Sequence, residues 1–99
     1  MTMDLADTLD EFAQQASSVF EGRSLSLPSF SARYPDFTLD DAYRVSALAH
    51  KIRLAKGYKP VGRKAGFTNR RIWDEYGVRA PNWGYVYECN LHDLARHCR

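Results

Sequence analysis

The stretch Val61-Gly62-Arg63-Lys64-Ala65-Gly66-Phe67 predicts a short β-strand. Successive side chains of a strand point to opposite faces, so Gly62, Lys64 and Gly66 share one face. Glycine inside a strand costs stability and often marks the close approach of a ligand or of another backbone. The pattern favours a lysine aimed into a pocket, able to pair with a carboxylate or an enolate oxygen. The alternative is a surface lysine on an edge strand with glycines at a β-bulge, and the pattern leaves both open.

Two amphipathic helices are predicted before this strand. The first covers about residues 4–20, has apolar residues at helical spacing and ends at Gly22. The second covers about residues 39–56, with Thr38 as N-cap and Asp41 as a weaker capping-box partner. The expected apolar faces are Leu5, Leu9, Phe12, Ala16 and Val19 in the first helix and Ala42, Val45, Leu48, Ile52 and Ala55 in the second.

The segments around these elements complete an α+β pattern. Residues 23–37 are rich in serine and proline and predict a linker. After the strand, a short helix is expected to begin at Thr68 or Asn69 and to close at Gly77, and a second strand to follow within residues 81–88. The order helix, helix, strand, helix, strand indicates an α+β or α/β fold and not an all-helical bundle, and we expect the α+β class. A length of 99 residues suits a single unit over 1–99, with the strand–helix–strand part at 61–88.

The charge of the chain is unevenly distributed, although its net value is only +2. Residues 43–71 contain nine basic and no acidic residues, which permits a small nucleic-acid binder. A protein that binds single-stranded nucleic acid also needs aromatic side chains between its basic residues. In this stretch only Tyr58 and Phe67 are interleaved with the basic residues. Part of the basic excess lies at the end of the second helix, where cations suit the helix dipole.

The sequence predicts a cytoplasmic protein with reduced thiols. Residues 1–10 carry three aspartates and lack the apolar core of a signal peptide. No window approaches 18 apolar residues, so no membrane span is expected. The spacing Cys89-x2-His92-x4-His97-Cys98 matches no zinc site.

Four motifs together resemble the 2-keto-4-pentenoate hydratase family, which includes 4-oxalocrotonate decarboxylases. They are Asp41-Ala42-Tyr43, the run Gly62 to Thr68, Tyr76-Gly77-Val78 and Pro81-Asn82-Trp83-Gly84. The family belongs to the fumarylacetoacetate hydrolase-like superfamily. The resemblance implies the N-terminal portion of such an enzyme, with an incomplete fumarylacetoacetase-like fold.

The resemblance also implies a reaction. Family members hydrate 2-hydroxydienoates in aromatic-compound catabolism, a lyase reaction. A bound Mg²⁺ or Mn²⁺ chelates the carboxylate and 2-oxo group of the substrate and stabilises the enolate. Lys64 matches the active-site lysine of the family and is expected to contact the substrate and to assist proton transfer. Gly62 and Gly66 are expected to keep space for the substrate around Lys64.

Two departures from the family pattern limit these expectations. The usual aspartate of the Pro-Asp-aromatic-Gly element is Asn82 here, which can orient a substrate or water but is not an ordinary general base. The family's metal ligands, a Glu-x-Glu pair and a further acid, lie beyond this element. Glu88 and Asp93 are the only later acids, so we expect no metal ligand and no metal cofactor for this chain alone.

Three hypotheses follow. The first is a truncated hydratase-like enzyme that is inactive alone and whose family acts on small 2-oxo or 2-hydroxy acids. The second is a non-catalytic binding or assembly module that pairs with a full-length relative or with itself. The third, which the motifs favour least, is a small basic nucleic-acid binder, whose affinity would fall steeply with salt.

Overall fold

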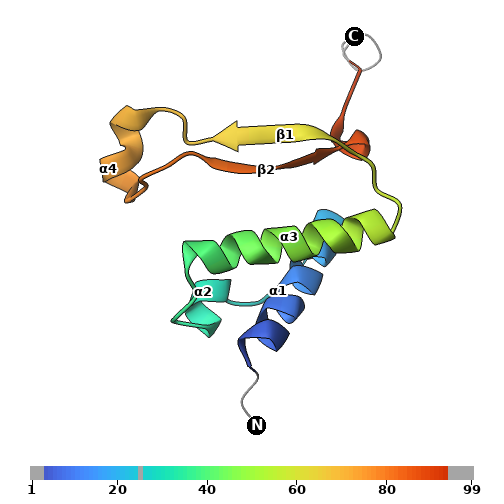
Figure 1. The fold of residues 1–99 in the computed structure, drawn as a ribbon, viewed down its shortest axis with the longest axis horizontal. Coiled ribbons are helices and arrows are strands. Elements are labelled where there is room, and N and C mark those ends of the chain that lie inside the picture. Colours follow the sequence, from blue (N-terminus) through green and yellow to red (C-terminus); the bar gives the residue numbers. More distant parts are fainter. Residues whose placement is uncertain (1–3, 25, 94–99) are drawn as a thin grey trace. The chain divides into compact units, whose positions relative to one another are not determined.

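The computed structural model describes residues 4–24 and 26–93 and divides the chain into two compact units, Met1–Gly57 and Tyr58–Arg99 (Figure 1). The first unit contains α1 (Leu5–Phe20), α2 (Phe30–Arg33) and α3 (Leu39–Ala55). The second contains β1 (Pro60–Gly66), the 3₁₀ helix η1 (Arg70–Ile72), α4 (Trp73–Tyr76), β2 (Asn82–Tyr87) and the 3₁₀ helix η2 (Glu88–Asn90). This architecture confirms the α+β class. None of the helices in the described part of the chain is long and apolar enough to cross a bilayer.

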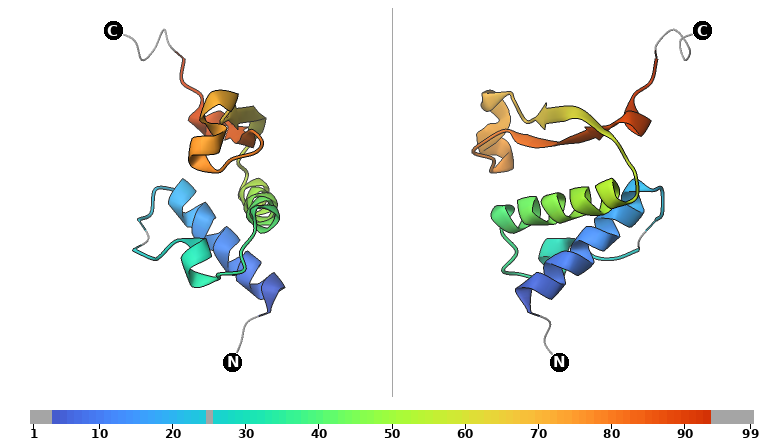
Figure 2. Two further views of the ribbon diagram at one scale, coloured as in Figure 1. Left: turned by 90° about the vertical axis from the view of Figure 1, so that its left-hand side faces the viewer. Right: turned by 45° about the vertical axis from the view of Figure 1, so that its right-hand side comes forward.

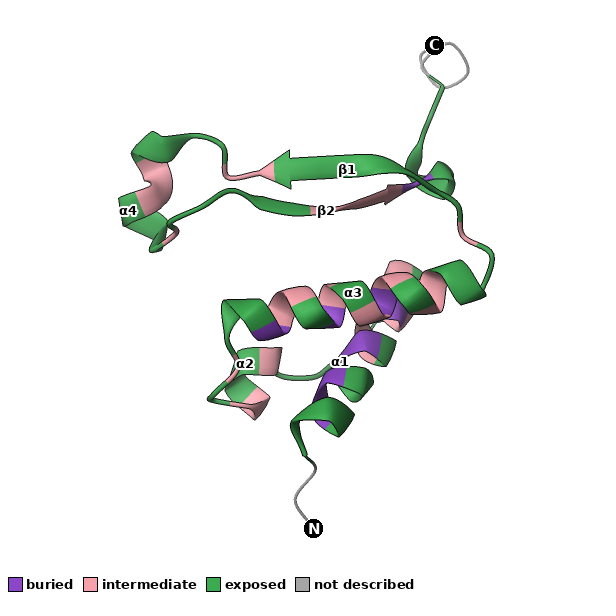
Figure 3. Ribbon diagram, viewed as in Figure 1, coloured by how far each residue is buried: buried purple, intermediate pink, exposed green. Residues whose placement is uncertain are grey.

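The core of the first unit lies between α1 and α3, which pack against each other (Figure 2). Figure 3 colours buried residues of both helices purple. The core cluster consists of Leu9, Phe12, Ala13, Val45 and Ala49. Small residues at Ala13 and Ala49 allow the two helix backbones to approach closely, while Leu9 and Phe12 fill the space beside them.

The buried face of α1 differs from the predicted one. Leu5 is 37% exposed and Val19 is 54% exposed, whereas Ala13 and Ser17 are buried. The prediction chose the apolar residues by helical spacing alone. In the structure, Ala13 belongs to the core cluster with Val45 and Ala49 of α3, and Ser17 is buried as well, so the buried stripe is shifted away from the two ends of the predicted face.

The predicted linker over 23–37 contains the short helix α2. Ser29 begins it, because its Oγ accepts a hydrogen bond from the Ala32 backbone N–H at 3.3 Å. The Phe30 ring stacks on Phe12 with ring centroids 4.2 Å apart, and Phe37 meets both rings edge-on. Aromatic burial therefore orders this segment, although its serine and proline content is typical of loops.

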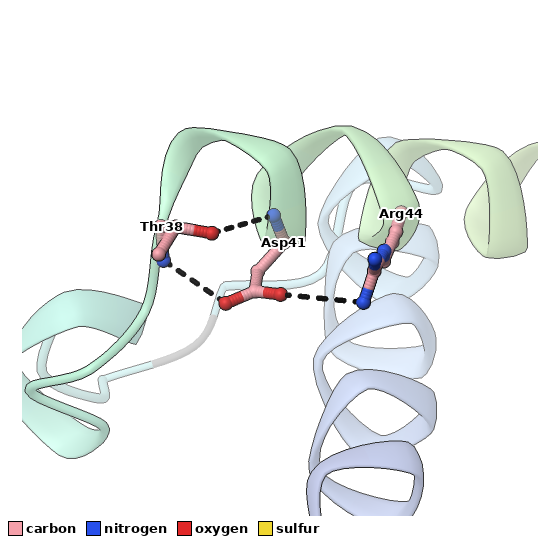
Figure 4. A network of polar contacts seen from close by, with 3 residues as sticks. All are labelled: Thr38, Asp41 and Arg44. Carbon is pink, nitrogen blue, oxygen red and sulfur yellow. Dashed lines mark hydrogen bonds and ion pairs between the residues drawn. The ribbon is translucent and has the colours of Figure 1, made fainter.

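A capping box begins α3 (Figure 4). Thr38 Oγ1 accepts from the Asp41 backbone N–H at 3.1 Å, and Asp41 Oδ2 accepts from the Thr38 backbone N–H at 3.0 Å. Arg44 Nη1 lies 3.8 Å from the other oxygen of Asp41. The buried Asp41 carboxylate thus accepts from the backbone N–H of the N-cap residue Thr38 and forms an ion pair with Arg44 in the next turn.

The second unit is an antiparallel hairpin of β1 and β2 with η1 and α4 in its connection. Five of the six residues from Pro60 to Ala65 are polar, glycine, proline or small, and the strand is exposed throughout that span. At the end of β2, Tyr87 is buried, with 1% exposure. A register shift between Pro60 and Gly62 is a β-bulge. Gly77 closes α4 with φ of 66°, a conformation that favours glycine.

Candidate functional site

The register of the hairpin surrounds Lys64 with glycines. Lys64 lies opposite Gly84, and Gly66 lies opposite Asn82. Because side chains alternate along each strand, Gly62 and Gly66 flank Lys64 on its own strand and share its face. Lys64 therefore has no neighbouring side chain at these three positions. Its cross-strand partner is Gly84, and its neighbours along the same face of β1 are Gly62 and Gly66.

A hollow of about 510 Å³ lies beside Lys64. Its volume is within the range of small-molecule sites, about 300–1,000 Å³. The residues that line it are Lys64, Gly66, Asn82, Trp83, Gly84, Tyr85, Val86 and Asn90. The hollow thus brings together three of the four site residues that the sequence predicts: Lys64, Gly66 and Asn82.

Gly62 is the fourth predicted site residue and is not among those that line the hollow. It adjoins the β-bulge of β1, which is the role that the alternative interpretation gives to a strand glycine. Each of the two interpretations therefore describes a different glycine: Gly62 belongs to the bulge, and Gly66 to the hollow.

The approach of Asn82 to Gly66 narrows the hollow at one point. A Cβ atom built on Gly66 would lie 2.5 Å from Asn82 Oδ1. No such crowding exists at Gly84 or Gly62, where a Cβ would meet nothing within 4 Å. A side chain at residue 66 would therefore collide with Asn82 in its present position, whereas the absence of a side chain at residue 84 leaves open space beside Lys64.

The charge of the hollow suits an anion. Among the described residues that line the hollow, Lys64 is the only formally charged one, and Asn82 and Asn90 add amide groups. A lysine ammonium offers three hydrogen-bond donors and no acceptor, and each amide offers two donors. From the described part of the chain, a carboxylate that enters the hollow meets one positive charge and up to two amide groups and no acidic lining residue.

Gly84 and Asn90 are additions to the predicted site. Gly84 is part of the Pro81-Asn82-Trp83-Gly84 motif, and only the strand register shows that it faces Lys64. Asn90 follows β2 in η2, where its Oδ1 accepts from the Tyr87 backbone N–H at 3.3 Å. No sequence signal marks Asn90, because its place depends on the turn after β2.

Many of the basic residues of the 43–71 stretch have structural contacts. The Arg63 guanidinium lies 5.1 Å from the Trp83 ring centroid and 5.6 Å from that of Tyr85, on the face of the hairpin opposite Lys64. Arg70 lies over the Trp73 ring. Stacking of this kind covers aromatic faces that a single-stranded nucleic acid would need.

Arg53, in α3, makes the same kind of contact in the helical unit. Its guanidinium lies 4.3 Å from the centroid of the Phe20 ring. The Lys56 ammonium, at the end of the same helix, pairs with Glu21 at 2.5 Å. Both ends of these interactions lie within the helical unit, so these cations support its packing.

The connection between the strands is held by a tryptophan. Phe67 follows β1 with φ of 53°, in the left-handed region that is uncommon for bulky side chains. Trp73 Nε1 donates to the Phe67 carbonyl oxygen at 2.8 Å, and the Phe67 ring meets Tyr76 edge-on at 5.6 Å. These contacts hold the turn that returns the chain to β2.

A second hollow, of about 350 Å³, lies in the helical unit and has mainly apolar walls. The one cation among its described lining residues is Arg33. Arg33 Nη2 donates to Gln15 Oε1 at 2.7 Å, and its Nε donates to the Pro28 carbonyl at 3.1 Å. The same guanidinium lies 4.8 Å from the Phe12 ring centroid. Arg33 therefore anchors α2 to α1, and the hollow offers little to a charged ligand.

The described residues do not fit a divalent cation. Within 4–24 and 26–93, no three His, Cys, Asp or Glu side chains gather into a group that could hold a metal. Cys89 is a free and exposed thiol. His97 and Cys98, from the spacing considered above, lie outside the described residues.

Known proteins similar to this chain in sequence include hydratases and decarboxylases. No family model matches the chain. It is 29% identical over 77 residues to the 2-keto-4-pentenoate hydratase of Paraburkholderia xenovorans (strain LB400), covering 76% of this chain and 29% of the hydratase. It is 34% identical over 62 residues to the 4-oxalocrotonate decarboxylase of Pseudomonas sp. (strain CF600), covering 63% of this chain and 24% of the decarboxylase.

Solved structures show the same relationship for the fold. The 4-oxalocrotonate decarboxylase from Pseudomonas putida G7, complexed with calcium and acetate, matches with a TM-score of 0.75 and 22% identity, over 89% of this chain and 33% of that one. The same enzyme complexed with magnesium and adipate matches with a TM-score of 0.69. This chain spans about a third or less of the length of the proteins it matches. The resemblance predicted from the motifs is thereby confirmed: over part of their length, the chain is similar to 2-keto-4-pentenoate hydratases and 4-oxalocrotonate decarboxylases.

Proposed function

We propose that this chain provides the lysine-bearing, substrate-binding part of an enzyme of the hydratase and decarboxylase kind, which acts on a small 2-oxo or 2-hydroxy acid. The observation that carries the proposal is the hollow that joins Lys64, Gly66, Asn82 and Gly84. The motifs that resemble the family contribute all four of these residues. The relatives named for hydration of 2-hydroxypent-2,4-dienoate and for decarboxylation of 4-oxalocrotonate support the substrate class.

Lys64 is proposed to bind the acid and to move a proton. Its ammonium pairs with the carboxylate or with the enolate oxygen of the acid, which favours the negatively charged form of the ligand. The same Nζ can hold a proton at the oxygen or carbon that changes protonation during tautomerisation. The glycines on three sides of Lys64 leave its ammonium accessible to the acid.

Asn82 is proposed to orient the acid or a water molecule. An amide keeps one acceptor and two donors at any ordinary pH, so Asn82 does not take a proton as the family's aspartate would. Catalysis by this site then depends on Lys64 for proton transfer.

Binding of a stable 2-oxo acid tests the proposal directly. We expect 2-oxopentanoate to shift the amide resonances of Lys64, Gly66, Asn82 and Gly84 in ¹⁵N-labelled protein. Lys64→Met should abolish these shifts, because it keeps the length of the side chain and removes its charge. Lys59→Met is the matched control. It makes the same change of net charge at the residue directly before β1, and Lys59 does not line the hollow.

Shifts that persist in Lys64→Met, or that gather around residues of the helical unit, would contradict the proposal. A separate assay with 2-hydroxypent-2,4-dienoate and Mg²⁺ addresses turnover. We expect no hydration by the chain alone, since its described residues gather no metal ligands. Turnover that depends on Lys64 would show that the chain is itself a complete catalyst.

A second candidate function is an assembly module. In the hairpin unit, Tyr76 is 62%, Val61 43% and Trp83 41% exposed, and a two-stranded sheet is marginally stable without further packing. These features favour association with a full-length relative or with a second copy. Co-purification with a 2-hydroxypent-2,4-dienoate hydratase would support this function, and a monomer by light scattering that ignores the hydratase would exclude it.

A further inference from the structure

Asn90 contributes to the Lys64 hollow from outside the strands that carry the motifs. It lies in η2, directly after β2, and its side chain lines the hollow together with Lys64 and Asn82. Lys64 lies opposite Gly84, between the two ends of β2. Asn82 begins β2 and Asn90 follows its end, so the two amides reach the hollow from different ends of one strand.

The amide of Asn90 has a defined orientation. Its Oδ1 accepts from the Tyr87 backbone N–H at 3.3 Å, which assigns the oxygen to the turn. The hydrogen-bond donors of the side chain are the two N–H groups on Nδ2. Tyr87 is buried, so the turn that holds Asn90 is attached to the most buried residue of the hairpin.

We propose that Asn90 is a further binding residue of this site, and that its Nδ2 donates a hydrogen bond to an oxygen of the small acid that Lys64 holds. The inference rests on the function proposed above and adds a residue to it. A lysine ammonium attracts an anion as a point charge but directs it poorly. A fixed amide donor selects one orientation of the acid, because a hydrogen bond weakens steeply away from linearity.

The test compares two serine substitutions, each at an asparagine whose Oδ1 holds a turn. Asn90→Ser removes the Nδ2 donor and, because the serine side chain is one atom shorter, also weakens the hydrogen bond from the Tyr87 N–H. Asn69→Ser is the matched control: Asn69 Oδ1 accepts from the Arg71 backbone N–H at 3.1 Å at the start of η1, and Asn69 does not line the hollow.

The probe is 2-oxopentanoate, titrated into the full ¹⁵N-labelled chain. Loss of one hydrogen bond to a charged group is expected to raise the Kd of Asn90→Ser about tenfold. Asn69→Ser should bind like the wild-type protein. In the wild-type protein, the Asn90 side-chain amide resonances should shift on titration, a readout that does not depend on the folding of any variant.

The possible outcomes separate this inference from the proposed function. If the wild-type protein binds and Lys64→Met does not, but Asn90→Ser binds normally or the Asn90 side-chain resonances stay in place, the role of Asn90 is overturned and that of Lys64 stands. If the wild-type protein does not bind the acid, both fall. An equal loss in Asn69→Ser and Asn90→Ser would assign the effect to the stability of the turns and would also overturn the inference.

Discussion

Asn82 Oδ1 occupies the space that a side chain on Gly66 would need, at 2.5 Å from the position of its Cβ. The two residues are cross-strand partners at the end of the hairpin, and both line the Lys64 hollow. The missing side chain of one residue thereby determines where the amide of the other can lie. The relationship connects the sequence motif around Lys64 with the motif that begins at Pro81.

Gly66→Ala is therefore expected to displace the Asn82 amide. We expect a loss of about 1 kcal/mol in the free energy of unfolding, because a side-chain oxygen must move from its place. The same substitution in an Asn82→Ala background should cost little, since the crowding atom is gone. Chemical unfolding of the two single variants and the double variant measures this coupling as a double-mutant cycle. Strictly additive effects would mean that the two side chains do not compete for space.

Gly84→Val should separate folding from binding. A Cβ at residue 84 meets nothing within 4 Å, and valine favours a strand more than glycine does. We therefore expect stability to be kept or raised by up to about 1 kcal/mol. The valine side chain stands opposite Lys64, so binding of 2-oxopentanoate should fall at least about tenfold, a change of about 1.4 kcal/mol. Wild-type affinity in a folded Gly84→Val protein would show that the acid does not enter this hollow.

The capping box of α3 is expected to stabilise the helical unit measurably. Asp41→Ala removes the acceptor of the Thr38 N–H and the partner of Arg44, with an expected loss of about 1 kcal/mol or more. Asp40→Ala is the control, because it removes an equal charge from the same first turn without touching the box. Urea unfolding followed by far-UV circular dichroism compares the two. Equal losses would assign the effect to the helix dipole instead of the box.

The alternation of side chains along a strand is enough to predict the face that Lys64 shares with Gly66. The identity of the residue opposite Lys64 depends on the register, which is constant from the Gly62–Val86 pair to the Gly66–Asn82 pair and shifts between Pro60 and Gly62. A shift of one residue would exchange the two faces of one strand. No short motif in the sequence encodes such a shift, so the facing position of Gly84 emerges only from the structure.

Asn90 and the helix α1 illustrate a second limit of sequence patterns. A hydrogen bond from the Tyr87 backbone N–H holds Asn90 in a 3₁₀ turn beside the hollow, and any polar residue after a strand would look similar in the sequence.

In α1, helical spacing identifies Leu9 and Phe12 as core residues but also selects Leu5 and Val19, which are exposed. Helical spacing defines which residues of α1 share one face. Which edge of that face is buried depends on where small residues such as Ala13 contact α3.

The corrected face of α1 leads to a last prediction about stability. Leu9 is 6% exposed within the core cluster, whereas Val19 is 54% exposed. Leu9→Ala should lower the free energy of unfolding by about 2–4 kcal/mol, because it removes buried methyl groups and leaves a cavity that the helices fill only in part. Val19→Ala should change it by less than about 0.5 kcal/mol, since little surface is buried there. Both substitutions shorten an apolar side chain of one helix to alanine, so differences in helix propensity are small beside the burial term. Urea unfolding under identical conditions distinguishes the two faces: a cost at Val19 comparable to that at Leu9 would restore the stripe read from spacing alone, and would mean that a further surface covers the end of α1 in solution.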